Sequence, residues 1–190
     1  MNKYVKAIYD NKPGGATNFI GDIFFKIDKT YYRLYIGLMA VGILCHGFML
    51  FNKLPNHDDV IAIADKGTTY KLGRWFLEAT GIISGMFSIP LFIGIFSISM
   101  IIFSAFLVCE VLEIKRVGRI FAIGALMVCF PTVAGTFAFM FTADSYFLAL
   151  FFSCMGIWLS VKLPVRIKFG GVIINYILSI ILLTLALGIY

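Results

Sequence analysis

The stretch that decides the fold is Ile89–Leu112, IPLFIGIFSISMIIFSAFLVCEVL, in which Glu110 is the only charged residue. An α-helix crosses a bilayer with about 20 consecutive apolar residues, so this stretch is long enough to span one. In the whole chain 61% of the residues are hydrophobic and 14% are charged. Soluble domains are about 25% charged. The composition therefore excludes a soluble globular domain and predicts an all-α, polytopic membrane protein.

Four further apolar runs accompany this stretch. They are Tyr32–Phe51, Ile120–Met140, Tyr146–Val161 and Val172–Tyr190. The five runs together predict about five transmembrane helices in a single membrane domain, residues 1–190, with a tail at 1–31 and a loop at 52–88. The run Tyr146–Val161 is short and is expected to borrow flanking residues. Pro131 lies inside one run and predicts a kink there, because proline lacks the backbone N–H.

Basic residues mark alternate segments between the runs. These segments contain Lys3, Lys6, Lys12, Lys26, Lys29 and Arg33, then Lys115, Arg116 and Arg119, then Lys162, Arg166 and Lys168. The positive-inside rule predicts that they are cytoplasmic, together with the N-terminus. The loop 53–88 and the segment around Asp144 then share the external side. Two amphipathic stretches, Asn18–Thr30 and Lys71–Met86, are expected to lie on the inner and outer interfaces as helices.

The net charge of +6 is explained by the same pattern. Because the basic residues flank apolar runs, membrane lipids and not nucleic acid are the expected partners. His46 lies inside the first run and favours a hydrogen bond between helices. The cysteines lie in apolar runs without metal or redox spacing, so packing at helix contacts is expected rather than disulfides or zinc. They are Cys45, Cys109, Cys129 and Cys154.

Two adjacent carboxylates follow the first run, in His57-Asp58-Asp59. Three interpretations fit them. One carboxylate acts as a general base that takes the proton of an attacking hydroxyl. Alternatively, the pair holds a divalent cation through oxygen ligands. In the third interpretation the acids favour the start of a helix through its dipole.

Arg74 is the candidate cation of the same loop, in Gly73-Arg74-Trp75. A guanidinium beside an aromatic ring at the membrane interface suits bidentate binding of a lipid-linked phosphate. It equally suits snorkelling to the headgroups or pairing with Glu78, four residues on. Lys71 is a second candidate for binding the phosphate.

Asp144 is the only charged residue between Arg119 and Lys162. It either marks a tight loop between two spans or supplies a second acid that faces Asp58 and Asp59 from the external side. Patterns typical of an ATP-driven pump or a metalloprotease are missing from the sequence, which has no P-loop and no metal-spaced histidine cluster.

The order of these features resembles a known family. After the first run come Asn56-His57-Asp58-Asp59, then Gly73-Arg74-Trp75, then Asp144-Ser145-Tyr146-Phe147-Leu148-Ala149. In this order the chain is similar to the N-terminal part of the polytopic glucosyltransferases that modify O-antigen in serotype-converting phages and their bacterial relatives. Those enzymes are similar to the wider GT-C class. GT-C proteins usually have more spans, so the chain is expected to be a fragment, a truncated product or a compact relative.

The resemblance implies a fold, a reaction and partners. A GT-C-like enzyme in the bacterial inner membrane would take a sugar, here glucose, from a polyprenyl-phosphate carrier. It would pass the sugar to a polysaccharide or lipopolysaccharide acceptor on the extracytoplasmic side. Asp58 or Asp59 would serve as the catalytic base or position the acceptor, with His57 and Glu78 in support. Asp144 would match the second external acid, and Arg74 and Lys71 would face the carrier phosphate.

The sequence also leaves a choice about the cofactor and an alternative function. A divalent cation, Mg or Mn, is a cofactor only if Asp58 and Asp59 bind one. The alternative function is non-enzymatic: a membrane protein that binds or flips lipid-linked sugar, or an assembly subunit. A flippase needs polar residues along a path through the spans, and only His46, Asn175 and some serines and threonines qualify, which favours the enzyme.

Overall fold

The computed structural model describes residues 29–52, 73–81, 89–162 and 169–189, in which every regular element is an α-helix. The helices are α3 (Lys29–Phe51), α6 (Leu77–Gly81), α7 (Pro90–Val111), α8 (Val117–Val128), α9 (Pro131–Phe137), α10 (Met140–Val161) and α11 (Phe169–Ile189). Residues Tyr35–Tyr190 form one compact unit, and the contacts below belong to it. The predicted all-α fold is confirmed for the described residues.

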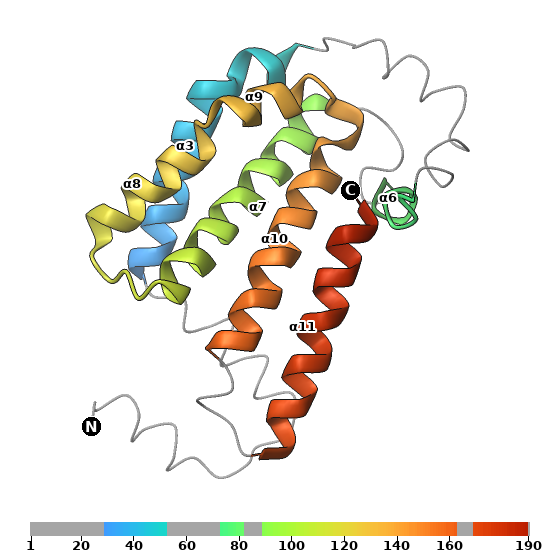
Figure 1. Ribbon diagram of the computed structural model, residues 1–190. Helices are drawn as coiled ribbons and strands as arrows, with labels where there is room; N and C mark the ends of the chain where they lie inside the picture. The colour runs from blue at the N-terminus through green and yellow to red at the C-terminus, as the bar shows by residue number, and fades with distance from the viewer. Residues whose placement is uncertain (1–28, 53–72, 82–88, 163–168, 190) are drawn as a thin grey trace. The chain divides into compact units, whose positions relative to one another are not determined.

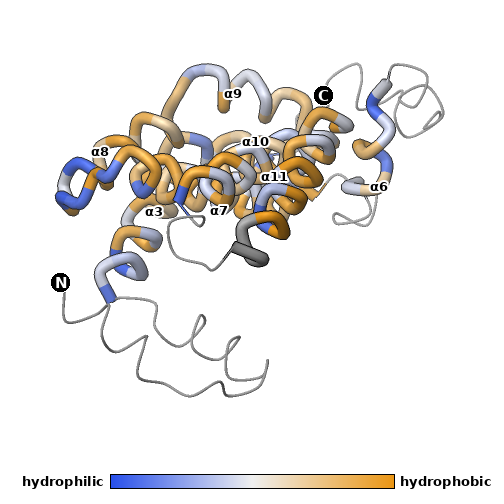
Figure 2. The backbone as a smooth tube through the Cα atoms, turned by 60° about the horizontal axis from the view of Figure 1, so that its bottom comes forward, coloured by the Kyte–Doolittle hydropathy of each residue, from blue (hydrophilic) through white to orange (hydrophobic). Residues whose placement is uncertain are grey.

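Three helices, α3, α7 and α10, are long and apolar enough to cross a membrane. The pair α8 and α9 adds a fourth span if the two are counted together. The prediction of five spans is therefore too high for the described residues. The expected fifth span corresponds to α11 (Phe169–Ile189), of which the stretch Ile173–Ile189 is counted as a shorter apolar helix and not among the spans. Figure 2 shows hydrophobic residues along the bodies of these helices.

Proline breaks the span between α8 and α9, as predicted. Phe130 is extended, with φ −62° and ψ 136°, and Pro131 occupies the first turn of α9. The residue before a proline is pushed out of the helical region, and proline has no N–H to continue the ladder of hydrogen bonds. The two helices consequently meet at 43°.

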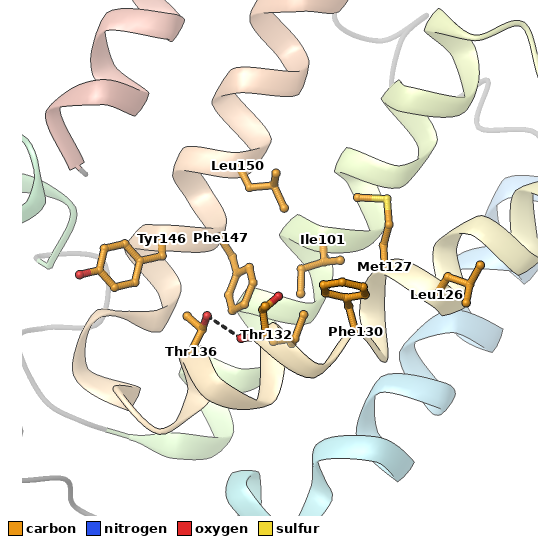
Figure 3. Close-up of a pocket in the computed structure, with 10 residues that line it drawn as sticks. Ile101, Leu126, Met127, Phe130, Thr132, Thr136, Tyr146, Phe147 and Leu150 are labelled. Atoms are coloured by element: carbon orange, nitrogen blue, oxygen red, sulfur yellow. Dashed lines mark hydrogen bonds between the residues drawn. The ribbon is translucent and has the colours of Figure 1, made fainter.

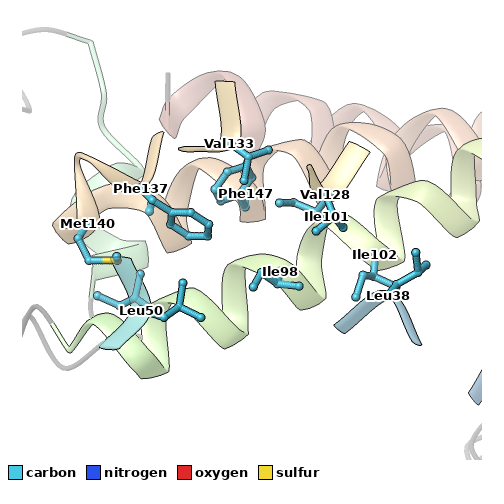
Figure 4. Close-up of a cluster of buried hydrophobic side chains, with 12 residues drawn as sticks. Leu38, Leu50, Ile98, Ile101, Ile102, Val128, Val133, Phe137, Met140 and Phe147 are labelled. Atoms are coloured by element: carbon cyan, nitrogen blue, oxygen red, sulfur yellow. The ribbon is translucent and has the colours of Figure 1, made fainter. Parts of the chain in front are cut away.

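The helix α10 is central in this unit. It packs against α7 on one side and α11 on the other, and α7 also packs against α8 (Figure 1). A buried cluster joins residues of five helices (Figure 4), including Leu38 and Leu50 of α3, Ile98 of α7, Val128 of α8 and Phe137 of α9. Glycines allow the close contacts at its edges. A Cβ on Gly94 would lie 2.5 Å from Cγ of Leu50.

A matched pair of glycines in α8 tests this packing. A Cβ on Gly124 would lie 2.5 Å from Cδ1 of the fully buried Leu38, whereas nothing lies within 4 Å of the same position on Gly118. We expect Gly124→Leu to lower the free energy of unfolding by about 1–3 kcal/mol, because the side chain overfills the interface. Gly118→Leu is expected to cause no loss. Unfolding of the purified protein in mixed micelles measures both, and equal losses would contradict the packing of α3 on α8.

Two polar contacts tie α3 to the break between α8 and α9. His46 is buried, and its Nε2 lies 2.9 Å from the carbonyl oxygen of Val128. This contact confirms the predicted hydrogen bond between helices. One residue away on each helix, the Sγ atoms of Cys45 and Cys129 lie 3.0 Å apart as free thiols. The expected location of cysteines at helix contacts is confirmed for this pair.

The two thiols are close enough to be cross-linked. We expect copper phenanthroline to oxidise Cys45 and Cys129 to an intramolecular disulfide, each thiol losing a proton and an electron to the oxidant. Mass spectrometry of peptides without reduction detects the linked pair, and Cys129→Ser is the control that prevents it. Cys109 and Cys154 are expected to stay reduced under the same conditions and to be alkylated once the protein is denatured. A disulfide that joins either of them to Cys45 would contradict the contact.

An ion pair joins the residues that follow the C-terminal ends of α7 and α10. Nζ of Lys162 lies 2.7 Å from Oε1 of Glu113. This hydrogen bond, with the positive charges of Lys162 and Lys115, holds the pKa of Glu113 below its ordinary value of 4.5. A lowered carboxyl pKa stabilises the fold above the ordinary pKa, and this contribution disappears as the pH falls through the lower, folded-state value. Both side chains are in reach of solvent, so the effect is small.

Candidate functional site

A short segment, residues 73–81, carries Arg74 and packs onto the ends of two helices. Gly73 adopts φ +82°, in the left-handed region that favours glycine, and α6 begins four residues later at Leu77. The backbone N–H of Phe76 donates to the carbonyl oxygen of Gly188 in α11, at 2.8 Å. Leu77 is buried against Ala149 of α10 and the end of α11. The segment is therefore held by both α10 and α11.

Trp75 sets the contact with α11. A Cβ on Gly188 would lie 2.5 Å from Cε2 of the Trp75 indole, so only glycine leaves room for the ring at this distance. The indole stays half exposed, and Leu77 and Thr80 are the buried residues of the segment.

The predicted amphipathic helix Lys71–Met86 is only partly correct. Among its described residues only Leu77–Gly81 is helical, and Trp75 and Phe76 lie in the turn before it. The positive φ of Gly73 keeps this residue out of a regular helix. The buried residues of the segment are Leu77 and Thr80, whereas Trp75 and Ala79 are exposed.

Arg74 is joined to α10 through Tyr146. Its guanidinium Nη1 donates to the phenolic oxygen of Tyr146 at 3.2 Å, and both side chains are half-buried. The two residues are 72 positions apart in the chain. A half-buried guanidinium held in one position is a pre-organised donor for an anion. Glu78, the alternative partner suggested by its spacing, is exposed.

Asp144 lies beside this pair in a buried position. It is 2% exposed, and its Oδ1 accepts the backbone N–H of Ser145 at 2.8 Å. The hydroxyl of Ser145 lies 2.8 Å from Oγ1 of Thr80 in the segment that carries Arg74. Burying a carboxylate is costly unless it is hydrogen-bonded. Asp144 belongs to α10 and Arg74 to residues 73–81, and the hydrogen bonds Arg74–Tyr146 and Thr80–Ser145 join these two elements.

The interpretation of Asp144 as the mark of a tight loop is wrong. The residue is inside α10, which begins at Met140 and continues to Val161. Thr142, Ala143 and Ser145 are buried with it, so this small and polar stretch packs inward as a helix instead of turning in solvent. The short fourth run does borrow these flanking residues, as expected.

Tyr146 is also one of the residues that line an apolar pocket of about 430 Å³ (Figure 3). Its walls come from α7, α8, α9 and α10 at the break before Pro131. Its polar lining residues are Thr132, Thr136 and Tyr146. The hydroxyl of Thr136 donates to the carbonyl oxygen of Thr132 at 2.9 Å. The pocket thus presents a mostly hydrophobic surface beside the Arg74–Tyr146 pair.

Several predicted site residues, His57, Asp58, Asp59 and Lys71, lie outside the described residues, as does most of the stretch Asn18–Thr30. Within the described part of the chain, no group of three or more His, Cys, Asp or Glu residues is arranged to hold a metal ion. A cation bound by Asp58 and Asp59 stays a prediction.

The contributions of Tyr146, Ser145 and Thr80 did not follow from sequence reasoning. Ser145 and Tyr146 directly follow Asp144 in the motif that carries the family resemblance, and this position was the available signal. Gly188 had no signal of its own, because its role depends on the indole that packs against it.

A comparison with known protein families gives a match over most of the chain. The sequence model of the family described as glucosyl transferase GtrII matches residues 47–190, which include Arg74, Asp144, Tyr146 and the lining of the pocket. Neither a curated protein nor a solved structure matches the chain.

Proposed function

The chain belongs to the glucosyl transferase GtrII family, and from that premise we propose that it transfers glucose from a polyprenyl-phosphate carrier to O-antigen or a related lipopolysaccharide. The observation that carries the proposal is the Arg74–Tyr146 pair: Tyr146 also lines the apolar pocket, and the buried Asp144 precedes it by two residues in α10. A carrier lipid has parts that suit these groups: a sugar, an anionic phosphate and a hydrocarbon chain.

Arg74 binds the carrier phosphate in this proposal. When the bond between the anomeric carbon and the phosphate oxygen breaks, its electron pair stays with the phosphate, whose negative charge increases. A guanidinium that is already in place stabilises this charge without reorganising. Tyr146 keeps the guanidinium in position through the 3.2 Å hydrogen bond.

An acid of the first external loop completes the transfer. The acceptor hydroxyl attacks the anomeric carbon, and its proton passes to the carboxylate of Asp58 or Asp59. If the pair binds Mg²⁺ or Mn²⁺ instead, transfer stops on chelation with EDTA and resumes when either ion is added. Transfer that persists in EDTA excludes the metal role, and the Asn variants described in the Discussion then separate proton transfer from a structural role.

Asp144 is the second acid of the proposed site and acts as a positioning residue. Its carboxylate accepts the N–H of Ser145, whose hydroxyl contacts Thr80. This chain of contacts holds residues 73–81 against α10, and so keeps Arg74 near Tyr146.

The proposed setting is the bacterial inner membrane, with a GT-C-like arrangement. The positive-inside rule supports a cytoplasmic N-terminus and an external site. Glu113 and Lys162 pair at the opposite end of α10 from Asp144, in segments that this orientation places inside. Lipid-linked donor and lipopolysaccharide acceptor would meet at the external end.

The test is a transfer assay in membranes that contain this chain. Radiolabelled polyprenyl-phosphate-glucose is the donor, lipopolysaccharide is the acceptor, and membranes without the chain are the control. We expect label in the lipopolysaccharide only when the chain is present. A chain that inserts normally, passes the Cys45–Cys129 cross-linking test and transfers no label would overturn the proposal in favour of a binding or assembly protein.

A further inference from the structure

We propose that the pocket at the break between α8 and α9 binds the isoprenoid chain of the lipid-linked sugar, with its phosphate-proximal isoprene units beside Tyr146. This inference rests on the proposed function, and it assigns a separate part of the donor to a separate set of residues. The volume of about 430 Å³ falls in the range typical of ligand pockets, roughly 300–1,000 Å³.

The shape of the pocket comes from the broken span. Because α8 stops at Val128 and α9 leaves at 43°, the two helices do not continue as one cylinder. Space opens between the break and the facing side of α10. In Figure 3 the side chains of Phe130, Phe147 and Leu150 surround this space. An unbroken helix would carry side chains through the same region.

The chemistry of the walls suits a hydrocarbon. Most lining side chains are aliphatic or aromatic. The hydroxyl of Thr136 is already donated to the carbonyl of Thr132, so it does not need a polar ligand (Figure 3). Burying the apolar surface of a ligand against these side chains is favourable.

Tyr146 links this hydrocarbon site to the anion site. Tyr146 is one of the lining residues of the pocket, its side chain points away from Phe147 and Leu150 in Figure 3, and its hydroxyl accepts the hydrogen bond from Arg74. An occupant with an apolar chain and an anionic head is therefore complementary to both. In a polyprenyl phosphate the phosphate is joined directly to the hydrocarbon, whereas in a phospholipid the glycerol separates the phosphate from the acyl chains, so an anion site next to an apolar pocket suits the carrier.

Photolabelling tests the assignment. The probe is [³²P]farnesyl phosphate with a diazirine on its terminal isoprene, added to the full chain in nanodiscs. We expect label on peptides that contain residues 126–136 or 146–150. Unlabelled geranylgeranyl phosphate should compete, and hexadecyl phosphate, which is saturated and unbranched, should compete at least 10-fold more weakly. Label elsewhere, or equal competition by hexadecyl phosphate, would show an ordinary lipid contact and overturn the inference.

Three leucines provide matched variants. Leu150→Trp fills the pocket, and Leu126→Trp blocks it from a lining position that is 71% exposed and therefore tolerant of a larger side chain. Leu44→Trp is the control, at a position that is 84% exposed and outside the pocket. We expect labelling to fall about 10-fold in the first two variants and to stay unchanged in the control. Unchanged labelling in Leu126→Trp, with native Cys45–Cys129 cross-linking, would contradict the pocket assignment.

Glucose transfer by the same proteins separates the two proposals. If the wild type transfers glucose and neither the label nor transfer responds to Leu126→Trp, the pocket assignment fails and the enzyme stands. If the probe labels the pocket and the wild type transfers no glucose, the enzyme proposal fails and the isoprenoid site stands.

Discussion

Glucose transfer is expected to fall by about 10²- to 10⁴-fold when the catalytic member of the pair Asp58 and Asp59 is replaced by Asn, the usual contribution of a general base. Asparagine keeps the size of the side chain and removes its basicity, so binding of the donor should change little. Single variants Asp58→Asn and Asp59→Asn are compared with the wild type in the membrane transfer assay, at equal amounts of inserted protein.

Asp65→Asn is the matched control, because it removes another carboxylate of the same segment, residues 52–88. We expect it to retain wild-type transfer. The pair would lose its assigned role if both single variants, and the double variant, transferred glucose at the wild-type rate.

The second large effect is expected at Arg74. Arg74→Gln should lower kcat/KM by about 10²- to 10³-fold, because removing one pre-organised donor from a developing negative charge has effects of this size. Arg74→Lys should recover part of the loss, since it restores the charge without the bidentate fork. Initial rates at several donor concentrations measure both variants.

Tyr146→Phe separates positioning from catalysis at the same place. It removes the acceptor of the Arg74 hydrogen bond and keeps the aromatic ring of this pocket-lining residue. A loss of about 5-fold is expected, because such a bond contributes about 1 kcal/mol. Arg119→Gln, an exposed arginine in α8, is the control and should transfer normally. Equal losses in Arg74→Gln and Arg119→Gln would show a general effect of charge and contradict the assigned role.

Helix positions were largely predictable because hydropathy is a local property. Each apolar run corresponds to a described helix or helix pair, and Pro131 marks the break because proline acts on its own backbone. The number of spans was less predictable. Whether α8 and α9 make one span or a broken one depends on how the pair sits in the bilayer, which composition does not state.

The candidate site was partly predictable. Arg74 and Asp144 were selected by their charge, which is conspicuous in a chain with only 14% charged residues. Their partners were not, because Tyr146, Ser145 and Thr80 are ordinary residues whose roles arise from contacts. Asp144 was assigned to a loop as one alternative, since one charge in a short segment between apolar runs looks solvent-facing.

The sequence by itself determined that this is a helical membrane protein of the glucosyltransferase family, with a proline break in one span. Apolar length, proline and short charged motifs act through neighbouring residues, so they are readable along the chain. Only the tertiary structure decided that Asp144 is buried in α10, that Arg74 meets Tyr146 and that a pocket opens beside them. These features depend on which helix faces pack together, and packing joins residues that are far apart in sequence.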